Sequence, residues 1–176
     1  RSGEYPQAKS VGNGTTTPRD ICTREDAVPV LVSLCESVGE RLRRLGATAC
    51  TLTLELRDAA GLSWISRRAP LPRPTDCSAE LICAALALVD ACHDWSRPLR
   101  SLAVRAEQLI FSPDEQLDCF SSYPELDAQR SLDRAIDGLR ARFGAGAVMR
   151  GAVFADPDMA CPPMQEKYSF VRKPGL

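Results

Sequence analysis

Threonine or arginine side chains alternate with apolar residues in two segments of this 176-residue chain. Within residues 51–57, Thr51, Thr53 and Arg57 alternate with leucines, and Arg105 alternates with small apolar residues in the same way. Hydroxyl and guanidinium groups donate hydrogen bonds to phosphate oxygens and carry no information about base sequence. The spacing therefore predicts a phosphate-binding surface, with an ordinary solvated face as the alternative.

A second pattern that could act in recognition is a short peptide at residues 116–120. Gln116 stands beside two large apolar residues, Leu117 and Phe120, in a segment too polar to fold alone. Two apolar anchors on such a segment can fill a pocket on another protein. We interpret this stretch as a docking peptide. The alternative is a loop whose apolar residues pack on the chain's own core.

Residues that could hold a metal or catalyse a reaction are sparse. The chain has eight cysteines, none of them in a C-x-x-C pair, and one histidine, so neither a disulfide framework nor a zinc site is expected. Asp156 and Asp158 flank a proline and are interpreted as a solvated turn. We predict no catalytic residue and no metal site, and the free thiols predict a reducing, cytoplasmic compartment.

The charge of the chain excludes indiscriminate binding to nucleic acid. Its net charge is −1, and residues 1–110 carry 14 Lys and Arg against 13 Asp and Glu, which gives that part +1. Any grip on DNA must therefore come from a few placed arginines. No apolar run approaches the roughly 20 residues that span a bilayer, so no membrane partner is expected. The first four residues carry no signal pattern and predict an excised fragment.

The elements that would position these residues start with a polar segment, residues 9–20, which predicts an edge strand leading into a loop. Apolar residues then recur at spacings of three and four in residues 31–45, which predicts a helix. Asp26 is the expected cap of this helix, Pro29 is expected in its first turn, and Gly46 is expected to end it.

The following segments predict a hairpin, a second helix and a last strand. Alternation predicts strands at residues 51–57 and 62–69. A proline-rich stretch, residues 70–74, leads to a helix capped near Asp76, and another alternating strand follows Pro98.

This order, β-α-β-β-α-β, predicts an α+β fold with a four-stranded antiparallel sheet. Both helices are amphipathic and must bury their apolar sides on one face, which leaves the other face, with the predicted phosphate-binding residues, open. Consecutive strand residues point to opposite faces, so only one of Arg67 and Arg68 lies on the open side, and the sequence does not say which. Trp64 is either a packing residue or a stacking platform.

The last part of the chain predicts one further helix. Leu132, Ile136, Leu139 and Phe143 recur at helical spacing before Gly144, and a short extended apolar segment follows. The apolar stripe of this helix packs either on the preceding domain or on another partner. We expect four parts in all: the α+β domain at 1–110, a linker with the docking peptide at 111–125, the helix and extended segment at 126–154, and an irregular tail at 155–176.

Three strand motifs resemble those of the little finger domain of Y-family translesion DNA polymerases, the group that includes bacterial DNA polymerase IV. The motifs are Lys9-Ser10-Val11-Gly12-Asn13-Gly14-Thr15-Thr16-Thr17, Ile65-Ser66-Arg67 and Ser101-Leu102-Ala103-Val104-Arg105. The likeness spans residues 5–110. Residues 116–120 are similar to the family's clamp-binding peptide, commonly Gln-Leu-x-Leu-Phe, and residues 130–154 resemble the C-terminal tail of some bacterial members.

The resemblance implies that the sheet lies in the major groove and grips the backbones of primer–template DNA during damage tolerance and repair. It implies that Lys9, Ser10 and Gly12 lie at a phosphate, where glycine lets main-chain N–H groups approach closely. Arg67 and Arg105 would supply positive charge. Sequence-independent contact of this kind suits an enzyme that tolerates lesions.

The resemblance also implies partners. Gln116, Leu117, Cys119 and Phe120 would bind the bacterial sliding clamp, with Cys119 where leucine is usual. The carboxylates that hold Mg²⁺ in this family belong to the palm domain, which this sequence does not match. The fragment is therefore expected to be inactive alone, to need no cofactor itself, and to work with the palm, fingers and thumb of the same polypeptide.

Two other functions share this order of elements. An RNA-binding module of the RRM type would stack bases on aromatic residues of its central strands, where this chain offers Trp64 at most. A protein-interaction domain is expected instead if the open face of the sheet is apolar or covered.

Overall fold

The computed structural model describes residues 8–61, 63–111 and 123–160. Its elements are β1 (Ser10–Ile21), α1 (Arg24–Leu45), β2 (Thr48–Asp58), β3 (Trp64–Thr75), α2 (Ser78–Cys92), β4 (Leu99–Ile110), α3 (Tyr123–Phe143) and a 3₁₀ helix, η1 (Gly151–Ala155). The predicted α+β fold and its β-α-β-β-α-β order, followed by one C-terminal helix, are confirmed.

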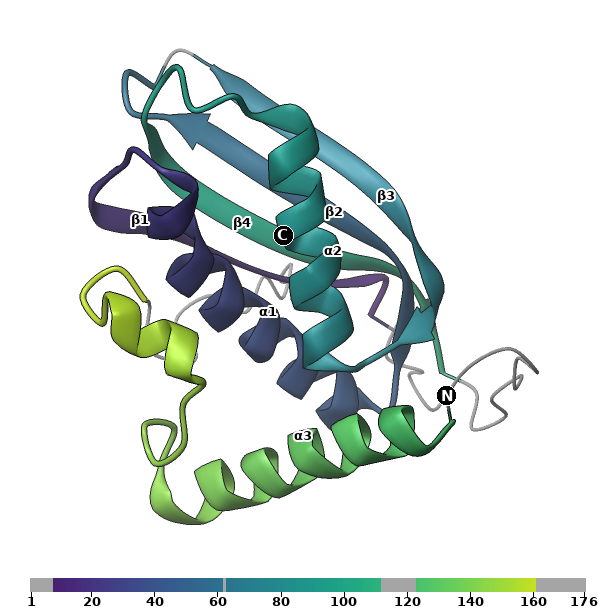
Figure 1. The fold of residues 1–176 in the computed structure, drawn as a ribbon. Coiled ribbons are helices and arrows are strands. Elements are labelled where there is room, and N and C mark those ends of the chain that lie inside the picture. The colour runs from purple at the N-terminus through teal and green to yellow at the C-terminus, as the bar shows by residue number, and fades with distance from the viewer. Residues whose placement is uncertain (1–7, 62, 112–122, 161–176) are drawn as a thin grey trace, which may run out of the picture.

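The four strands form one antiparallel sheet in the order β1-β4-β2-β3, so β4 and β2 are central and β1 and β3 are the edges. Helices α1 and α2 lie together on one face of this sheet (Figure 1). Leu52, Leu54 and Leu56 of β2 point toward the helices and are at most 1% exposed. Because side chains alternate along a strand, the intervening residues of β2 lie on the other face.

Helix α1 begins earlier than the sequence indicates. Thr23 is its N-cap, and Asp26, three residues further on, completes a capping box in which each side chain accepts from the other residue's main-chain N–H. Asp26 therefore supports the cap without being the cap itself. Pro29 lies beyond the first turn, contrary to expectation, because the helix starts at Arg24. Gly46 ends the helix in the left-handed conformation, with φ of 62°.

Strand β3 continues through the proline-rich stretch that was expected to follow it. Thr51 lies opposite Pro70, whereas Ala49 lies opposite Thr75, so residues 71–74 form a bulge in β3. An edge strand tolerates prolines because their missing N–H groups face away from the sheet, and a bulge removes the remaining conflict. The strand therefore ends at Thr75 instead of Ala69.

Helix α3 lies across the end of the helical layer, near the C-terminal end of α1 and the start of α2 (Figure 1). Its polar residues Asp133 and Arg140 are buried there, at 2% and 6% exposed. Of the predicted apolar stripe, Ile136 is buried, and the other three residues are exposed large side chains: Leu132, Leu139 and Phe143. The tail helix therefore packs on the preceding domain mainly through its polar side.

The segment after α3 also contacts the domain. Gly151–Ala155 forms the 3₁₀ helix η1 within the stretch expected to be extended, and Val153 packs with Val32 of α1 and Ala160. No helix in the described part of the chain combines the length and the apolar character needed to cross a membrane.

Candidate nucleic-acid interface

Strand register brings the predicted phosphate-binding residues onto the open face of the sheet. Gly12, Arg105, Thr53 and Arg68 form one row across the four strands, from β1 to β3. The row on one side of it consists of Ser10, Glu107, Thr51 and Pro70. The next row on the other side consists of Gly14, Ala103, Glu55 and Ser66. The row beyond that consists of Thr16, Ser101, Arg57 and Trp64. The open face is therefore built from small, hydroxyl-bearing and charged side chains.

The guanidinium groups at the centre of this face are paired with carboxylates. Arg68 Nε lies 3.3 Å from Glu107 Oε2, and Arg105 Nη2 lies 3.5 Å from Glu55 Oε1. Both arginine side chains remain about half exposed, at 51% and 48%. Ion pairs with this much exposure are weak, so phosphate oxygens can compete for the same N–H donors.

The two predicted threonines lie beneath these longer side chains. Thr51 Oγ1 donates to Gln108 Oε1 at 2.6 Å, and Thr53 Oγ1 donates to Glu107 Oε2 at 3.2 Å. Both threonines are buried although none of the helices in the described part of the chain covers this face, because they stand on the central strand β2. In this arrangement their hydroxyl groups hold side chains of β4.

The backbone of β4 explains why two consecutive residues reach the same face. Gln108 has φ of 54°, in the left-handed region that residues other than glycine rarely adopt. This conformation breaks the strict alternation of the strand, so that Glu107 and Gln108 both accept hydrogen bonds from threonines of β2.

At the β1 edge, the predicted phosphate residues meet an arginine from the helical layer. Lys9 and Ser10 are exposed at the start of β1. A Cβ on Gly12 would lie 3.3 Å from Arg105 Cγ, so glycine leaves room for the Arg105 side chain. Arg41 of α1 reaches this edge and donates from Nη1 to the main-chain oxygen of Gly12 at 2.7 Å.

Near the β2–β3 turn the open face carries Arg57 and Trp64 in the same row. Arg57 is exposed, and its guanidinium group lies over the turn. A Cβ added to Gly61 in that turn would be only 3.2 Å from Arg57 Nη2. Trp64 is 59% exposed on the edge strand. The central strands β2 and β4 place no aromatic side chain in the four rows.

The two consecutive arginines of β3 lie on opposite faces. Arg68 is opposite Thr53 and belongs to the open face, whereas Arg67 is opposite Leu54, whose side chain is in the core. Burial raises the pKa of the Cys92 thiol, and the positive charge of Arg67 opposes this rise, so Arg67 lies close to the end of α2. The sheet therefore separates Arg67 from Arg105.

The sequence model of the impB/mucB/samB family C-terminal domain matches residues 8–119, which include the whole sheet and both of its covering helices. The chain belongs to this family. The match bears out the resemblance to the Y-family polymerases that the three strand motifs indicated.

Curated relatives agree with this assignment. The chain is 34% identical to DNA polymerase IV of Acetivibrio thermocellus over 149 residues, which are 84% of this chain and 37% of that protein. It is 31% identical to DNA polymerase IV of Desulfatibacillum aliphaticivorans over 85% of this chain and 38% of that protein. It is also 31% identical to DNA polymerase IV 2 of Bacillus subtilis, over 82% and 35%. The chain thus spans little more than a third of the length of these relatives.

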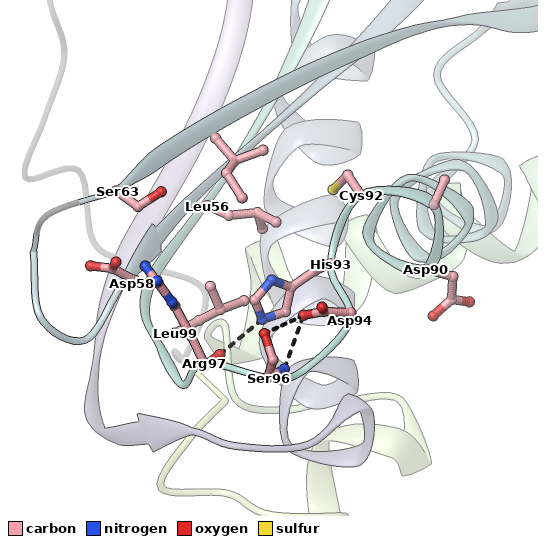
Figure 2. A pocket seen from close by; sticks show the side chains of 12 residues that line it. Leu56, Asp58, Ser63, Asp90, Cys92, His93, Asp94, Ser96, Arg97 and Leu99 are labelled. Carbon is pink, nitrogen blue, oxygen red and sulfur yellow. Dashed lines mark hydrogen bonds between the residues drawn. The ribbon is translucent and has the colours of Figure 1, made fainter.

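This impB/mucB/samB family member also has a pocket of about 520 Å³ on the helical side of the sheet (Figure 2). His93, at the end of α2, donates from Nε2 to the main-chain oxygen of Arg97 at 3.0 Å. Asp94 Oδ1 accepts from both the main-chain N and the Oγ of Ser96. These hydrogen bonds stabilise the α2–β4 loop, so the polar side chains in the pocket have a structural role that requires no ligand.

Neither the docking peptide nor the Mg²⁺ of the catalytic domain belongs to the described part of this interface. The docking peptide, Gln116, Leu117, Cys119 and Phe120, lies outside the described residues. Within residues 8–61, 63–111 and 123–160, no three His, Cys, Asp or Glu residues gather where they could hold a metal. The described residues therefore do not fit the Mg²⁺ that the family implies for its catalytic domain.

Sequence reasoning missed several residues of this interface. Glu107 lies two positions after Arg105, so continuing the alternation of β4 by one step identifies it. Glu55 lies between Thr53 and Arg57 in the same alternation, so the pattern of β2 identifies it in the same way. Arg68 was one of two alternatives, and the strand register is needed to choose it over Arg67. Arg41 has no sequence signal, because it is 29 residues from its partner Gly12.

Proposed function

We propose that this chain is the DNA-gripping little finger of a translesion DNA polymerase, and that its open sheet face binds the backbone of primer–template DNA. The observation that carries the proposal is the row of Gly12, Arg105, Thr53 and Arg68 across a polar face that no described helix or strand covers. Half-exposed guanidinium groups on the open face of a sheet suit phosphates, which repeat regularly along a duplex. Lys9, Ser10 and Arg57 extend this surface at its two ends.

The chemistry of the face supports this function over the two alternatives. An RRM-type module needs aromatic platforms on its central strands, whereas the open positions of β2 and β4 carry Thr51, Thr53, Arg105 and Glu107. A protein-interaction domain would present an apolar or covered face. Trp64 stands on the edge strand, where it can contact DNA only at the margin of the surface.

The test is salt-dependent binding of the full chain to a labelled primer–template duplex. If four phosphates are neutralised, log K falls with log salt concentration at a slope of about −3.6. Arg105→Ala and Arg68→Ala should each flatten this slope by about one unit. Arg67→Ala should have a smaller effect, because Arg67 lies on the other face at the edge of the sheet. Unchanged slopes for both open-face variants, or strong preference for one DNA sequence, would refute the proposal.

The whole protein would be a DNA-directed DNA polymerase of the cytoplasm that acts in DNA damage tolerance and repair. Its palm would hold Mg²⁺ with carboxylates, and its palm, fingers and thumb would place the active site against the duplex that this domain grips. This proposal rests on family membership and on the relatives that carry the name DNA polymerase IV. The contribution of this chain is to bind and orient the duplex.

The second proposed partner is the bacterial sliding clamp, bound by Gln116, Leu117, Cys119 and Phe120. The family match extends through Cys119 and so includes most of this peptide. Leu117 and Phe120 supply the apolar anchors, and Gln116 supplies an amide for hydrogen bonding at the rim of a pocket.

A further inference from the structure

Two carboxylates lie in the middle of a surface that is proposed to meet polyanionic DNA. Glu107 belongs to β4 and its partner Arg68 to β3, so the pair extends above the strand between them, β2. Glu55 of β2 pairs with Arg105 of the neighbouring strand β4. Like charge next to phosphate opposes binding, so these residues need an explanation beyond solvation.

The Arg68–Glu107 pair also covers the hydroxyl groups beneath it. Adjacent strands are about 4.8 Å apart, so side chains from β3 and β4 that meet above β2 must lie over its residues. Thr53 is only 7% exposed and donates to Glu107 Oε2 at 3.2 Å. A phosphate that is to reach the centre of the face must therefore displace a carboxylate from Arg68 first.

The exchange is physically feasible because these pairs are weak. Their arginine side chains are about half exposed, and solvent screens such pairs strongly. A phosphate offers two oxygens to a guanidinium in the same geometry as a carboxylate. The displaced carboxylates remain on the same face, however, and continue to repel the DNA backbone.

We propose that Glu107 and Glu55 limit the affinity of this face for duplex DNA. They occupy the guanidinium groups of Arg68 and Arg105 when DNA is absent, and so compete with phosphate for the same donors. DNA binding exchanges each carboxylate for a phosphate oxygen at the same guanidinium group, which keeps the grip weak and quickly reversible. This inference rests on the proposed function and adds to it the residues that set its strength.

The experiment compares three isosteric variants of the full chain: Glu107→Gln, Glu55→Gln and Glu25→Gln. Glutamine keeps the shape of the side chain and an oxygen that can accept from Thr53, and each variant raises the net charge by the same single unit. Glu25 is exposed at the start of α1, on the helical side, and controls for net charge alone. Fluorescence anisotropy with a labelled duplex gives the affinity, and stopped-flow dissociation gives the off-rate.

We expect Glu107→Gln and Glu55→Gln each to bind duplex about fivefold more tightly, mainly through slower dissociation, because no displaced carboxylate remains to repel the bound phosphate and to pair with the guanidinium again. Their salt slopes should be steeper than that of the wild type. Glu25→Gln should change affinity less than twofold. In an Arg68→Ala background, the gain from Glu107→Gln should fall to less than half, since the guanidinium that Glu107 holds is absent.

The outcomes separate this inference from the proposed function. If Arg105→Ala and Arg68→Ala leave binding unchanged, the open face is not the DNA site and both fail. If those variants weaken binding while Glu107→Gln and Glu55→Gln behave like Glu25→Gln, the DNA site stands and the inference is wrong. Weaker binding by the glutamine variants would also overturn it, because the carboxylates would then be preparing the arginines for DNA. Thermal unfolding of each variant checks that the fold is intact.

Discussion

At the scale of single residues, the missing side chain of Gly14 determines how closely the edge strand β1 approaches β4. A Cβ placed on Gly14 would lie 2.7 Å from the Cβ of Ala103 and 3.2 Å from the main-chain oxygen of Leu102. Real Cβ atoms do not approach one another this closely, so any side chain here would push the strands apart. The strand that carries Ser10 and Gly12 would then move relative to Arg105.

We expect Gly14→Ala to destabilise the fold by about 1–3 kcal/mol, as overpacking does in other well-packed sites. Gly138→Ala is the matched control, because its added methyl group meets no atom within 4 Å and alanine favours the helix α3. The control should stabilise the protein by up to about 1 kcal/mol. Chemical denaturation measures both changes. Equal stability of the two variants would contradict the close approach of β1 to β4.

At the scale of elements, α3 is attached to the helical layer by a network of buried charges. Asp133 is central to it: its Oδ2 accepts from the main-chain N of Ser78 at 2.8 Å and from Arg43 at 3.3 Å, and its Oδ1 accepts from Arg150 at 3.1 Å. Arg150 also donates to Glu36 of α1. Asp133 therefore caps the start of α2 from a distant helix, in place of the local cap expected near Asp76.

Asp133→Ala should cost about 3–5 kcal/mol, because it leaves two arginines and a main-chain N–H without this acceptor in a buried site. Asp127→Ala removes the same group from an exposed position of α3 and should change stability by less than about 0.5 kcal/mol. Denaturation gives the loss of stability, and hydrogen exchange shows whether α3 opens first. Similar behaviour of the two variants would show that the charge network does not hold α3.

The sequence predicted the elements well because each depends on local pattern. Alternation in β2 and β4 and the three-and-four spacing in α1 are short-range signals, and they also identified the open face. Contacts between distant residues carry no such signal. Arg43 and Asp137 are 94 residues apart in the sequence, so no local pattern indicates the ion pair between them. The face of Arg68 likewise depends on strand register, which the alternation of β3 does not fix.

At the scale of the whole molecule, residues 123–160 add to the helical side, and no described element covers the other face of the sheet (Figure 1). Helix η1 packs on α1, and the Arg43–Asp137 and Glu36–Arg140 ion pairs join α3 to α1, so both lie on the helical side of the sheet (Figure 1). The end of β4 and the start of α3 lie at the same end of the molecule (Figure 1). The docking peptide lies between these two elements in the sequence, so both of its ends are joined to folded parts of the chain.

We expect this peptide to bind a ring-shaped bacterial sliding clamp with micromolar affinity, about −8 kcal/mol. Leu117 and Phe120 would be the buried anchors, since two large apolar groups can offset the entropy lost when a short segment is ordered. Cys119 replaces a larger apolar residue of the usual motif. Cys119→Leu should therefore tighten binding by up to about 1 kcal/mol, or roughly fivefold.

Titration of labelled clamp with the full chain measures these affinities. Leu117→Ala/Phe120→Ala should weaken binding by at least about 30-fold, because each anchor contributes as a hot-spot residue does. Asp118→Ala is the matched control within the same peptide: its carboxylate would face water, so its loss should change affinity less than about twofold. The double variant leaves the sheet face untouched, so its affinity for duplex DNA should equal that of the wild type. Equal clamp binding by the wild type and the double variant would mean that residues 116–120 are an ordinary loop.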